Sequence, residues 1–315
     1  MARFASPVDL IGNTPLVDVS QLSPNPNVSL LIKLEGYNPG GSVKDRIARS
    51  MILAAEADGS LTPGQTIIES SSGNTGIGLA LVSRARGYKL KIVLPENVSP
   101  ERKQLLEIYG AEIIPSPGGE GSNGAIKVAQ KLAADHDDWW YPYQYANPAN
   151  VAAHYEGTGP EIWRDCPEIT HFVAGLGTSG TLLGVGRYLK EQNPAVQVWA
   201  VEPPTGEMVD GLKNLDEGYI PPIFIDNGGA ELLNRKKIVG PRDSILGVRA
   251  LATIGVLCGL STGAAYMGAI KCAAEIDAGT VVFLSPDGAW KYLSSDAWTG
   301  DIDAVTERAK KTLYF

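Results

Sequence analysis

A lysine directly follows a glycine-rich turn in the stretch NPGGSVKDRIARS, residues 38–50. Ser42 suits the N-cap of a helix that begins here, Asp45 suits its first turn, and Gly59 ends the apolar spacing. Lys44 is unusual, because a cation in the first turn faces the positive end of the helix dipole. It is either a solvated surface lysine or an amine kept neutral and nucleophilic, as a Schiff-base lysine requires.

Polar donors are concentrated in a second loop, SSSGNTG (70–76), which follows the apolar run at 65–70 and precedes a helical pattern. Hydroxyl and backbone N–H groups at a helix N-terminus form an anion site, here of a size suited to a carboxylate. The alternative is an ordinary polar helix cap, since Ser, Asn and Thr are favoured at such positions.

A third loop, GLGTSGT (175–181), also joins an apolar run to a helical pattern. Gly175, Gly177 and Gly180 match the GxGxxG pattern. Glu202 follows at the distance of the acidic ribose partner in dinucleotide-binding folds, so an NAD-dependent dehydrogenase is one interpretation. Glycines that open a helix N-terminus serve a single phosphate equally well.

Hydroxyl groups in this third loop favour a phosphate monoester, held by several hydrogen bonds, over a pyrophosphate. They belong to Thr178, Ser179 and Thr181. The loop therefore indicates a phosphate, and Lys44 indicates an aldehyde. Pyridoxal 5'-phosphate (PLP) carries both groups.

Short apolar runs alternate with helical patterns along the chain, which predicts an α/β fold with largely parallel sheets. In such folds, ligands bind where strand C-terminal ends meet helix N-terminal ends. The predicted strands are 28–35, 65–70, 90–96, 111–116, 170–177, 196–203 and 279–288, and the predicted helices are 45–58, 76–87, 99–110, 124–136, 181–192 and 262–276.

Composition excludes several classes of protein. The chain has 315 residues, 44% of them hydrophobic and 20% charged, which fits a globular protein with room for two domains. A net charge of -8 argues against a nucleic-acid surface. No apolar run is long enough for a membrane span or a signal peptide, so we expect a cytoplasmic protein. The three cysteines and three histidines are scattered, which predicts no metal site.

Two stretches of the sequence are candidate domain boundaries. One is the stretch YANPANVAAH (145–154), and the other is the NPGG turn. We expect a large domain of residues 1–40 and 148–315, and a smaller, mobile domain of residues 41–147. The active site would lie at their interface.

These loops, taken together, resemble the cysteine synthase and cystathionine β-synthase family of fold-type II PLP enzymes. Matching segments occur in family order along nearly the whole chain. They are IGNTPLV (11–17), KLEGYNPGGSVKDR (33–46), SSGNTGIGLA (71–80), LPENVSPERKQLLEIYGAEII (94–114), QYANPAN (144–150), HYEGTGPEIW (154–163), GLGTSGT (175–181), CGLSTGA (258–264) and KYLS (291–294). The resemblance implies two α/β domains with twisted sheets, similar to the tryptophan synthase β-subunit, and a homodimer.

The resemblance implies a role for each matching cofactor residue. Lys44 is similar to the lysine that binds PLP covalently, Asn74 to the partner of its 3'-oxygen, and Ser261 to the partner of its pyridine nitrogen. The expected phosphate ligands are Gly177, Thr178, Ser179, Gly180 and Thr181. Asp287 departs from the family, because many members have a serine there, so the charge beside the cofactor differs.

The resemblance also implies that the substrate α-carboxylate is bound by Ser71, Ser72, Thr75 and Gln144. The implied reaction is β-replacement on an O-activated L-serine. Lys44 would remove the α-proton as general base, the leaving group would depart, and a sulfur nucleophile would add at Cβ to give L-cysteine. Serine or threonine dehydratase, cystathionine β-synthase, a diaminopropionate-forming enzyme and a catalytically silent scaffold are the alternatives.

The segment EMVDGLKNLDEGYIPPIF (207–224) resembles a subgroup that uses O-phosphoserine. Lys213 stands where that subgroup has an arginine. It is either a ligand of the leaving group, without the two parallel hydrogen bonds that an arginine can make, or a solvated loop lysine. The subgroup takes sulfur from a thiocarboxylated small carrier protein and has a C-terminal tail that reaches the active site; the ending KKTLYF is compatible with such a tail. O-acetylserine with free sulfide remains the alternative.

Overall fold

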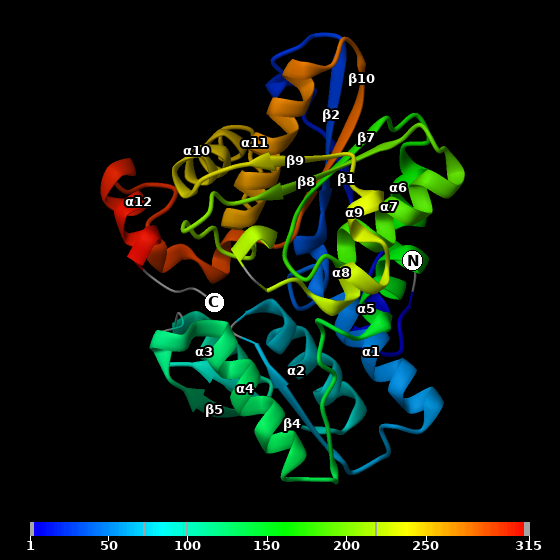
Figure 1. Cartoon of the computed structure of the whole chain (residues 1–315), viewed down its shortest axis with the longest axis vertical. Coiled ribbons are helices and arrows are strands. Elements are labelled where there is room, and N and C mark those ends of the chain that lie inside the picture. Colours follow the sequence, from blue (N-terminus) through cyan, green and yellow to red (C-terminus); the bar gives the residue numbers. More distant parts are fainter. Residues whose placement is uncertain (1–2, 72, 97, 99, 218, 312–315) are drawn as a thin grey trace.

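The computed structural model describes residues 3–71, 73–96, 98, 100–217 and 219–311 (Figure 1). The strands are β1 (Leu16–Asp18), β2 (Val28–Leu34), β3 (Thr66–Ser70), β4 (Lys89–Pro95), β5 (Glu112–Ser116), β6 (Trp139–Trp140), β7 (His171–Gly175), β8 (Gln197–Glu202), β9 (Arg235–Ile238) and β10 (Gly279–Ser285). The α-helices are α1 (Lys44–Asp58), α2 (Asn74–Arg86), α3 (Pro100–Ile108), α4 (Gly121–Ala134), α5 (Pro148–Ala153), α6 (Gly159–Asp165), α7 (Gly180–Gln192), α8 (Pro222–Asp226), α9 (Gly229–Leu232), α10 (Pro241–Ala252), α11 (Leu260–Glu275) and α12 (Ile302–Lys311).

The larger sheet has six strands in the order β1-β2-β10-β7-β8-β9, and it forms the upper part of Figure 1. Only β1 is antiparallel to its neighbour; the other pairs are parallel. Successive residues of a strand point to opposite faces. Val173 of β7 accordingly packs in the core under α10 and α11, while Phe172 and Ala174 pack in the core under α6 and α7. Both faces are therefore covered by helices.

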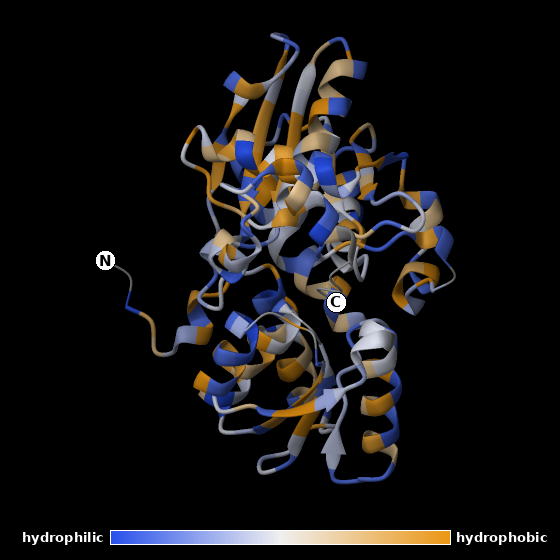
Figure 2. Cartoon of the chain, turned by 90° about the vertical axis from the view of Figure 1, so that its left-hand side faces the viewer, coloured by the Kyte–Doolittle hydropathy of each residue, from blue (hydrophilic) through white to orange (hydrophobic). Residues whose placement is uncertain are grey.

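The smaller sheet has four parallel strands in the order β5-β4-β3-β6, and it forms the lower part of Figure 1. Ile67 packs in a core with α1 and α2, whereas its neighbour Ile68 packs in a separate core with α4. Figure 2 shows the same pattern as hydrophobic strands between helices of mixed hydropathy. The predicted α/β architecture with largely parallel sheets is confirmed.

The seven predicted strands and six predicted helices all occur, with ends displaced by at most a few residues. The short strands β1, β6 and β9 were missed, because two to four residues are too few to show a period. The predicted N-cap Ser42 is wrong by one position: Val43 caps α1. The Ser42 hydroxyl instead accepts a hydrogen bond from the Lys44 amide at 3.1 Å, and the Val43 amide donates to Pro286 O at 2.8 Å.

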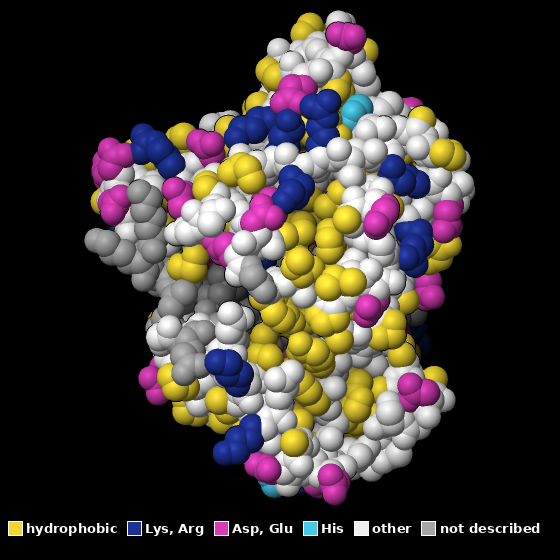
Figure 3. Space-filling view, in the orientation of Figure 1, with side chains coloured by type: hydrophobic (Ala, Val, Ile, Leu, Met, Phe, Trp, Pro, Cys, Tyr) yellow, Lys and Arg dark blue, Asp and Glu magenta, His cyan; other side chains and the backbone are white. Residues whose placement is uncertain are grey.

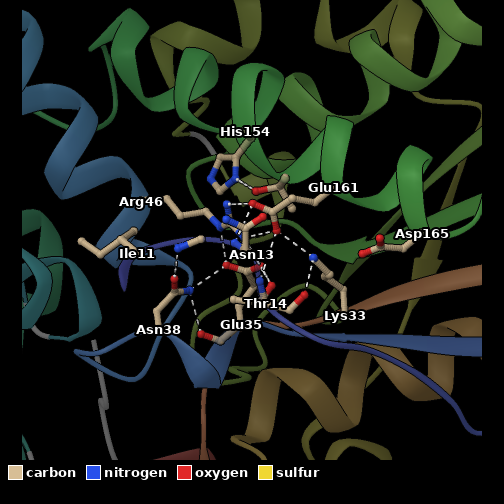
Figure 4. Close-up of polar contacts among 12 residues, drawn as sticks. Ile11, Asn13, Thr14, Lys33, Glu35, Asn38, Arg46, His154, Glu161 and Asp165 are labelled. Atoms are coloured by element: carbon tan, nitrogen blue, oxygen red, sulfur yellow. Dashed lines mark hydrogen bonds and ion pairs between the residues drawn. The ribbon is translucent and has the colours of Figure 1, made fainter. Parts of the chain in front are cut away.

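A buried ionic cluster ties α1 to the larger sheet (Figure 4). The Arg46 guanidinium donates to Glu35, at the end of β2, and to Glu161 of α6, with N–O distances of 2.6–2.9 Å. Lys33 Nζ lies 2.8 Å from the Glu161 carboxylate, and Thr14 Oγ1 donates to Glu35. Because both acids and both cations are paired, the charges are compensated within the cluster.

No helix in the described part of the chain is long and apolar enough to cross a membrane. Among the same residues there is no group of three or more His, Cys, Asp or Glu side chains placed to hold a metal ion.

Candidate active site

A pocket lies where the C-terminal ends of strands from both sheets meet the following helices. Ser70 ends β3, Gly175 ends β7 and Pro286 directly follows β10, and all three line the pocket. This is the position expected for a ligand in parallel α/β folds. The charged side chains that line it are Lys44, Arg102, Asp210 and Lys213.

Lys44 is the first residue of α1, so the turn before it decides where its amine lies. Gly41 has a φ of +79°, and a Cβ there would come within 2.8 Å of the Trp290 ring, so only glycine fits. Asp45 fixes the same turn by accepting from the Gly40 amide at 2.6 Å. Lys44 therefore enters the pocket from a rigid support.

The Lys44 amine has an environment that favours its neutral form. Burial lowers the pKa of Lys44 to about 8, while the negative charges of Asp287 and Glu35 oppose part of this effect. Because no carboxylate pairs with this amine among the described residues, a larger fraction is uncharged near neutral pH than for an exposed lysine. An uncharged amine is the form that attacks an aldehyde.

The predicted phosphate loop forms the N-terminus of α7, which begins at Gly180. Thr178 Oγ1 accepts a hydrogen bond from Asn150 Nδ2 at 3.1 Å, and Thr181 Oγ1 lies 3.2 Å from His154 Nε2. Burial lowers the pKa of His154, so this imidazole is neutral. The loop itself, as the N-terminus of a helix, presents backbone N–H groups to an anion. Gly177, Thr178, Ser179 and Thr181 all line the pocket. Gly180 is part of the same turn.

Gly180 cannot carry a side chain for a reason that the motif alone did not reveal. A Cβ at this position would lie 2.0 Å from Asn150 Oδ1. Asn150 lies in the first turn of α5, and its Nδ2 also donates to Gln144 O at 2.8 Å. The stretch QYANPAN thus connects the phosphate loop to the loop that carries Gln144.

Asn74, the first residue of α2, is held by hydrogen bonds on both sides of its amide. Its Nδ2 donates to Asp287 Oδ2 at 2.7 Å, and its Oδ1 accepts from Lys291 Nζ at 2.7 Å. Tyr292 OH also donates to Asp287 Oδ2, at 2.5 Å, and Lys291 Nζ donates to Gly41 O at 3.1 Å. One N–H of the Asn74 amide is left for a ligand.

Asp287 holds this arrangement together, because one of its carboxylate oxygens accepts hydrogen bonds from both Asn74 and Tyr292. Asp287 is buried, and its charge raises the proton affinity of Lys44. Asp287 therefore orients the Asn74 amide and raises the proton affinity of the Lys44 amine.

The proposed substrate loop caps α2. Ser71 Oγ accepts from the Gly76 amide at 3.0 Å and the Gly73 amide at 3.3 Å, so it is a helix cap as well as a pocket residue. Thr75 Oγ1 donates to Gln144 Oε1 at 2.7 Å, and both side chains line the pocket. Ser72 lies outside the described residues.

Ser261, near the start of α11, also lines the pocket. Its side chain is 5% exposed, and no side-chain hydrogen bond of Ser261 occurs within the described part of the chain. A buried hydroxyl normally has a partner, so the arrangement suits a bound group with a hydrogen-bonding nitrogen.

Lys213 lies in the pocket wall between two aromatic rings. Its Nζ is 4.6 Å from the centre of the Tyr145 ring and 4.8 Å from that of Tyr219. Burial lowers the pKa of Lys213 to about 8, and the rings stabilise its charged form without neutralising it. The ammonium group is therefore available to an anion.

The sequence analysis gave no role to several residues that line the pocket, among them Arg102, Asp210 and Tyr292. Arg102 Nη2 and Asp210 Oδ2 form a buried ion pair of 2.7 Å, and the guanidinium lies 5.1 Å from the centre of the Tyr292 ring. Single charged residues in the segments SPERKQ and EMVDG carried no signal, because each becomes informative only beside the other.

The residues of the pocket fit PLP on chemical grounds. They provide a weakly basic amine for the aldehyde, a helix N-terminus with hydroxyls for the phosphate, an amide N–H at Asn74, and the buried Ser261 hydroxyl for the ring. These groups come from segments far apart in the chain and meet in one pocket.

Comparison with known proteins agrees with this chemistry. The chain is 41% identical to cysteine synthase B of Pseudomonas aeruginosa, over 94% of this chain and 98% of that protein. The cysteine synthase structure from Entamoeba histolytica superposes with a TM-score of 0.88 at 32% identity, over 98% of this chain and 96% of that one. The O-acetylserine dependent cystathionine β-synthase structure from Helicobacter pylori gives a TM-score of 0.84 at 37% identity, over 93% and 98%.

The family model of the pyridoxal-phosphate dependent enzymes matches residues 8–287, which include the Lys44 turn, the N-terminal loop of α2 and the phosphate loop of α7. The cofactor is therefore PLP, and the fold is that of the fold-type II enzymes. The chain belongs to the family of pyridoxal-phosphate dependent enzymes.

Proposed function

We propose that this enzyme makes L-cysteine by β-replacement on an O-activated L-serine with a sulfur nucleophile. The observation that carries the proposal is one pocket holding three features: the Lys44 amine, the phosphate loop of α7 and the polar N-terminus of α2. The similarity to cysteine synthases over nearly the whole chain supports the same activity.

Each group has a defined task in this proposal. Ser71, Ser72 and Thr75 at the N-terminus of α2, together with Gln144 from the loop before α5, bind the substrate α-carboxylate. Asn74 and Ser261 orient the cofactor ring. PLP, when bound, takes up the electron pair left at the substrate α-carbon. Lys44 Nζ takes the α-proton as the C–O bond to the leaving group breaks, and it returns this proton after the C–S bond has formed.

The test is an assay of purified holoenzyme with O-acetylserine or O-phosphoserine and sulfide, with L-cysteine measured directly. We expect a yellow protein that forms cysteine and releases little pyruvate. Rapid pyruvate release without any response to sulfide would identify a dehydratase instead, and an inert yellow protein would indicate a scaffold.

The leaving group in the proposal is phosphate, because Lys213 offers an unneutralised charge in the pocket wall. Arginine would bind a phosphate with two parallel hydrogen bonds, whereas lysine acts as a point charge. The two tyrosine rings compensate in part by fixing where that charge lies. O-phosphoserine should therefore be preferred over O-acetylserine at low ionic strength.

We expect Lys213→Ala to reduce this preference roughly tenfold, about 1.4 kcal/mol, which is within the range of one charge-assisted contact. The preference should also fall as the pH rises through about 8, because the ammonium group is charged only below its pKa. Added salt should weaken it. The measurement is the ratio of kcat/KM for the two substrates.

Lys103→Ala serves as the matched control, because this lysine lies on α3 and donates to Glu96 O, outside the pocket. It should leave the substrate ratio unchanged. An unchanged ratio in Lys213→Ala as well would show that Lys213 takes no part in leaving-group binding, and O-acetylserine would become the proposed substrate.

The sulfur donor in this proposal is either sulfide or a thiocarboxylated small carrier protein. The proposal also places the enzyme in the cytoplasm. The C-terminal residues 312–315, on which the tail interpretation depends, lie outside the described residues. Comparing cysteine formation from the two donors separates them.

We also infer a homodimer. A groove runs between α1 and α5, and its lining combines polar and charged side chains with the apolar residues Leu53, Ala54, Trp140, Ala149 and Ala152. Figure 3 shows hydrophobic side chains gathered across the middle of the same face, where α5 and α8 lie. Contiguous apolar surface of this kind marks an interface.

Light scattering should give twice the 33.4 kDa mass of one chain. Leu53→Glu should shift the population toward the monomer, because a carboxylate at a partly exposed apolar position would be buried on association. A monomeric wild-type protein at micromolar concentration contradicts the inference.

The proposal includes the division into residues 1–40 with 148–315, and 41–147. All four strands of the smaller sheet lie within 41–147, which supports this division. Arg46 ties the start of α1 to Glu35 and Glu161 of the larger part, so the segment that carries Lys44 is anchored at the boundary between the two parts.

Cystathionine formation is the second candidate. The Helicobacter pylori relative favours it, since it is described as an O-acetylserine dependent cystathionine β-synthase. Replacing sulfide by homocysteine in the same assay distinguishes the two products.

A further inference from the structure

The buried pair Arg102–Asp210 joins two hydrophobic cores. Arg102 lies on α3, where Leu106 packs in the core of the smaller sheet. Asp210 lies between Val209 and Leu212, which both pack in the core of the larger sheet. The 2.7 Å contact is therefore a bond between the two halves of the molecule.

The same pair forms part of the pocket wall. Both side chains are 3% exposed and both residues line the pocket. Tyr292, under the Arg102 guanidinium, donates to Asp287, which in turn accepts from Asn74. Contacts at the pair thus continue directly to groups that surround the cofactor position.

We propose that the Arg102–Asp210 ion pair is a latch, which holds the two halves closed over the pocket and opens to admit substrate and release product. This proposal relies on the proposed function only in placing an amino-acid ligand in the pocket.

An ion pair suits a reversible latch better than an apolar contact. Both charges lose their hydration when the pair is buried, and the attraction between them roughly balances this cost. Burial raises the pKa of the Asp210 carboxyl to about 6, and Arg102 offsets only part of the effect. When the halves separate, water solvates both charges again, so opening requires little free energy.

The test uses PLP-loaded enzyme and needs no turnover. We measure how fast borohydride fixes the cofactor on Lys44, and how fast the backbone amides of α3 exchange with deuterium. Asp210→Asn and Arg102→Met should each speed fixation several-fold and increase exchange in α3, because an open pocket admits the reagent. Asp210→Glu keeps the carboxylate and should behave like the wild-type enzyme.

Two control variants remove the same charges away from the pocket. Lys103→Met removes a cation from α3, and Asp216→Asn removes an exposed carboxylate from the segment that follows Asp210. Both should match the wild type. The latch is refuted if Asp210→Asn or Arg102→Met fixes cofactor no faster than these controls, or if Asp210→Glu behaves like Asp210→Asn. Because fixation does not depend on cysteine formation, a wild-type enzyme that makes no cysteine overturns the proposed function and leaves this test intact.

Discussion

Lys44→Ala should lower the rate of cysteine formation by about 10²- to 10⁴-fold, the usual contribution of a positioned acid–base group. Lys213, the other lysine among the described residues that line the pocket, lies on a different loop between two tyrosine rings, so we do not expect it to replace Lys44. The rate is measured with saturating O-activated serine and sulfide, after PLP has been added in excess.

Lys44→Arg tests whether position 44 needs a reactive amine or only a positive charge. A guanidinium keeps the positive charge but stays protonated, so it neither attacks an aldehyde nor accepts the α-proton. This variant should be as inactive as Lys44→Ala, and neither should be labelled by PLP and borohydride. Thermal unfolding of cofactor-free Lys44→Ala should match the wild type, since burial disfavours the charged lysine in the folded state, whereas Lys44→Arg buries a permanent charge and should unfold at a lower temperature. Activity above a tenth of the wild-type rate in either variant would remove Lys44 from its proposed role.

Arg46→Met should lower the free energy of unfolding by about 3–5 kcal/mol, the typical cost of leaving buried partners of an ion pair uncompensated. The guanidinium is the central member of the cluster in Figure 4, and its loss leaves Glu35 with the Thr14 hydroxyl and the Asn38 amide, and Glu161 with Lys33. The measurement is urea denaturation of the cofactor-free protein.

The same substitution should change how stability depends on pH. Burial alone would raise the pKa of Glu161, but Arg46 and Lys33 hold it at about 2. A carboxylate with a lowered folded-state pKa contributes stability above its unfolded-state value, near 4.5, and loses it as the pH falls toward 2. Arg46→Met should therefore lose less stability than the wild type across this range.

Arg242→Met is the matched control, because its partner Asp303 is exposed and such surface pairs contribute about 0–1 kcal/mol. A second variant, Arg46→Met with Glu35→Gln, should recover part of the lost stability by removing one unpaired charge. An effect of Arg46→Met no larger than that of Arg242→Met would show that the cluster is not a stabilising element.

Local patterns in the sequence were sufficient to predict the α/β fold and the three loops that meet at the pocket. Strand and helix periodicity extends over five or more residues, and each loop lies between one strand and the next helix, so short-range signals locate them. The combination of an amine with a phosphate loop then indicated PLP. The N-cap of α1 was misplaced by one residue, since the Val43 amide bonds to Pro286, which lies 243 positions away in the sequence numbering.

Only the tertiary structure determined how the site residues are held and charged. Asn74 and Asp287 are 213 positions apart, and Arg102 and Asp210 are 108 apart, yet each pair forms a buried contact. The lowered pKa of Lys44 likewise depends on what surrounds it rather than on its neighbours in the chain. Hydrogen bonds, burial and charge act over a few ångströms in space, so they are decided when the two sheets pack and bring distant segments together.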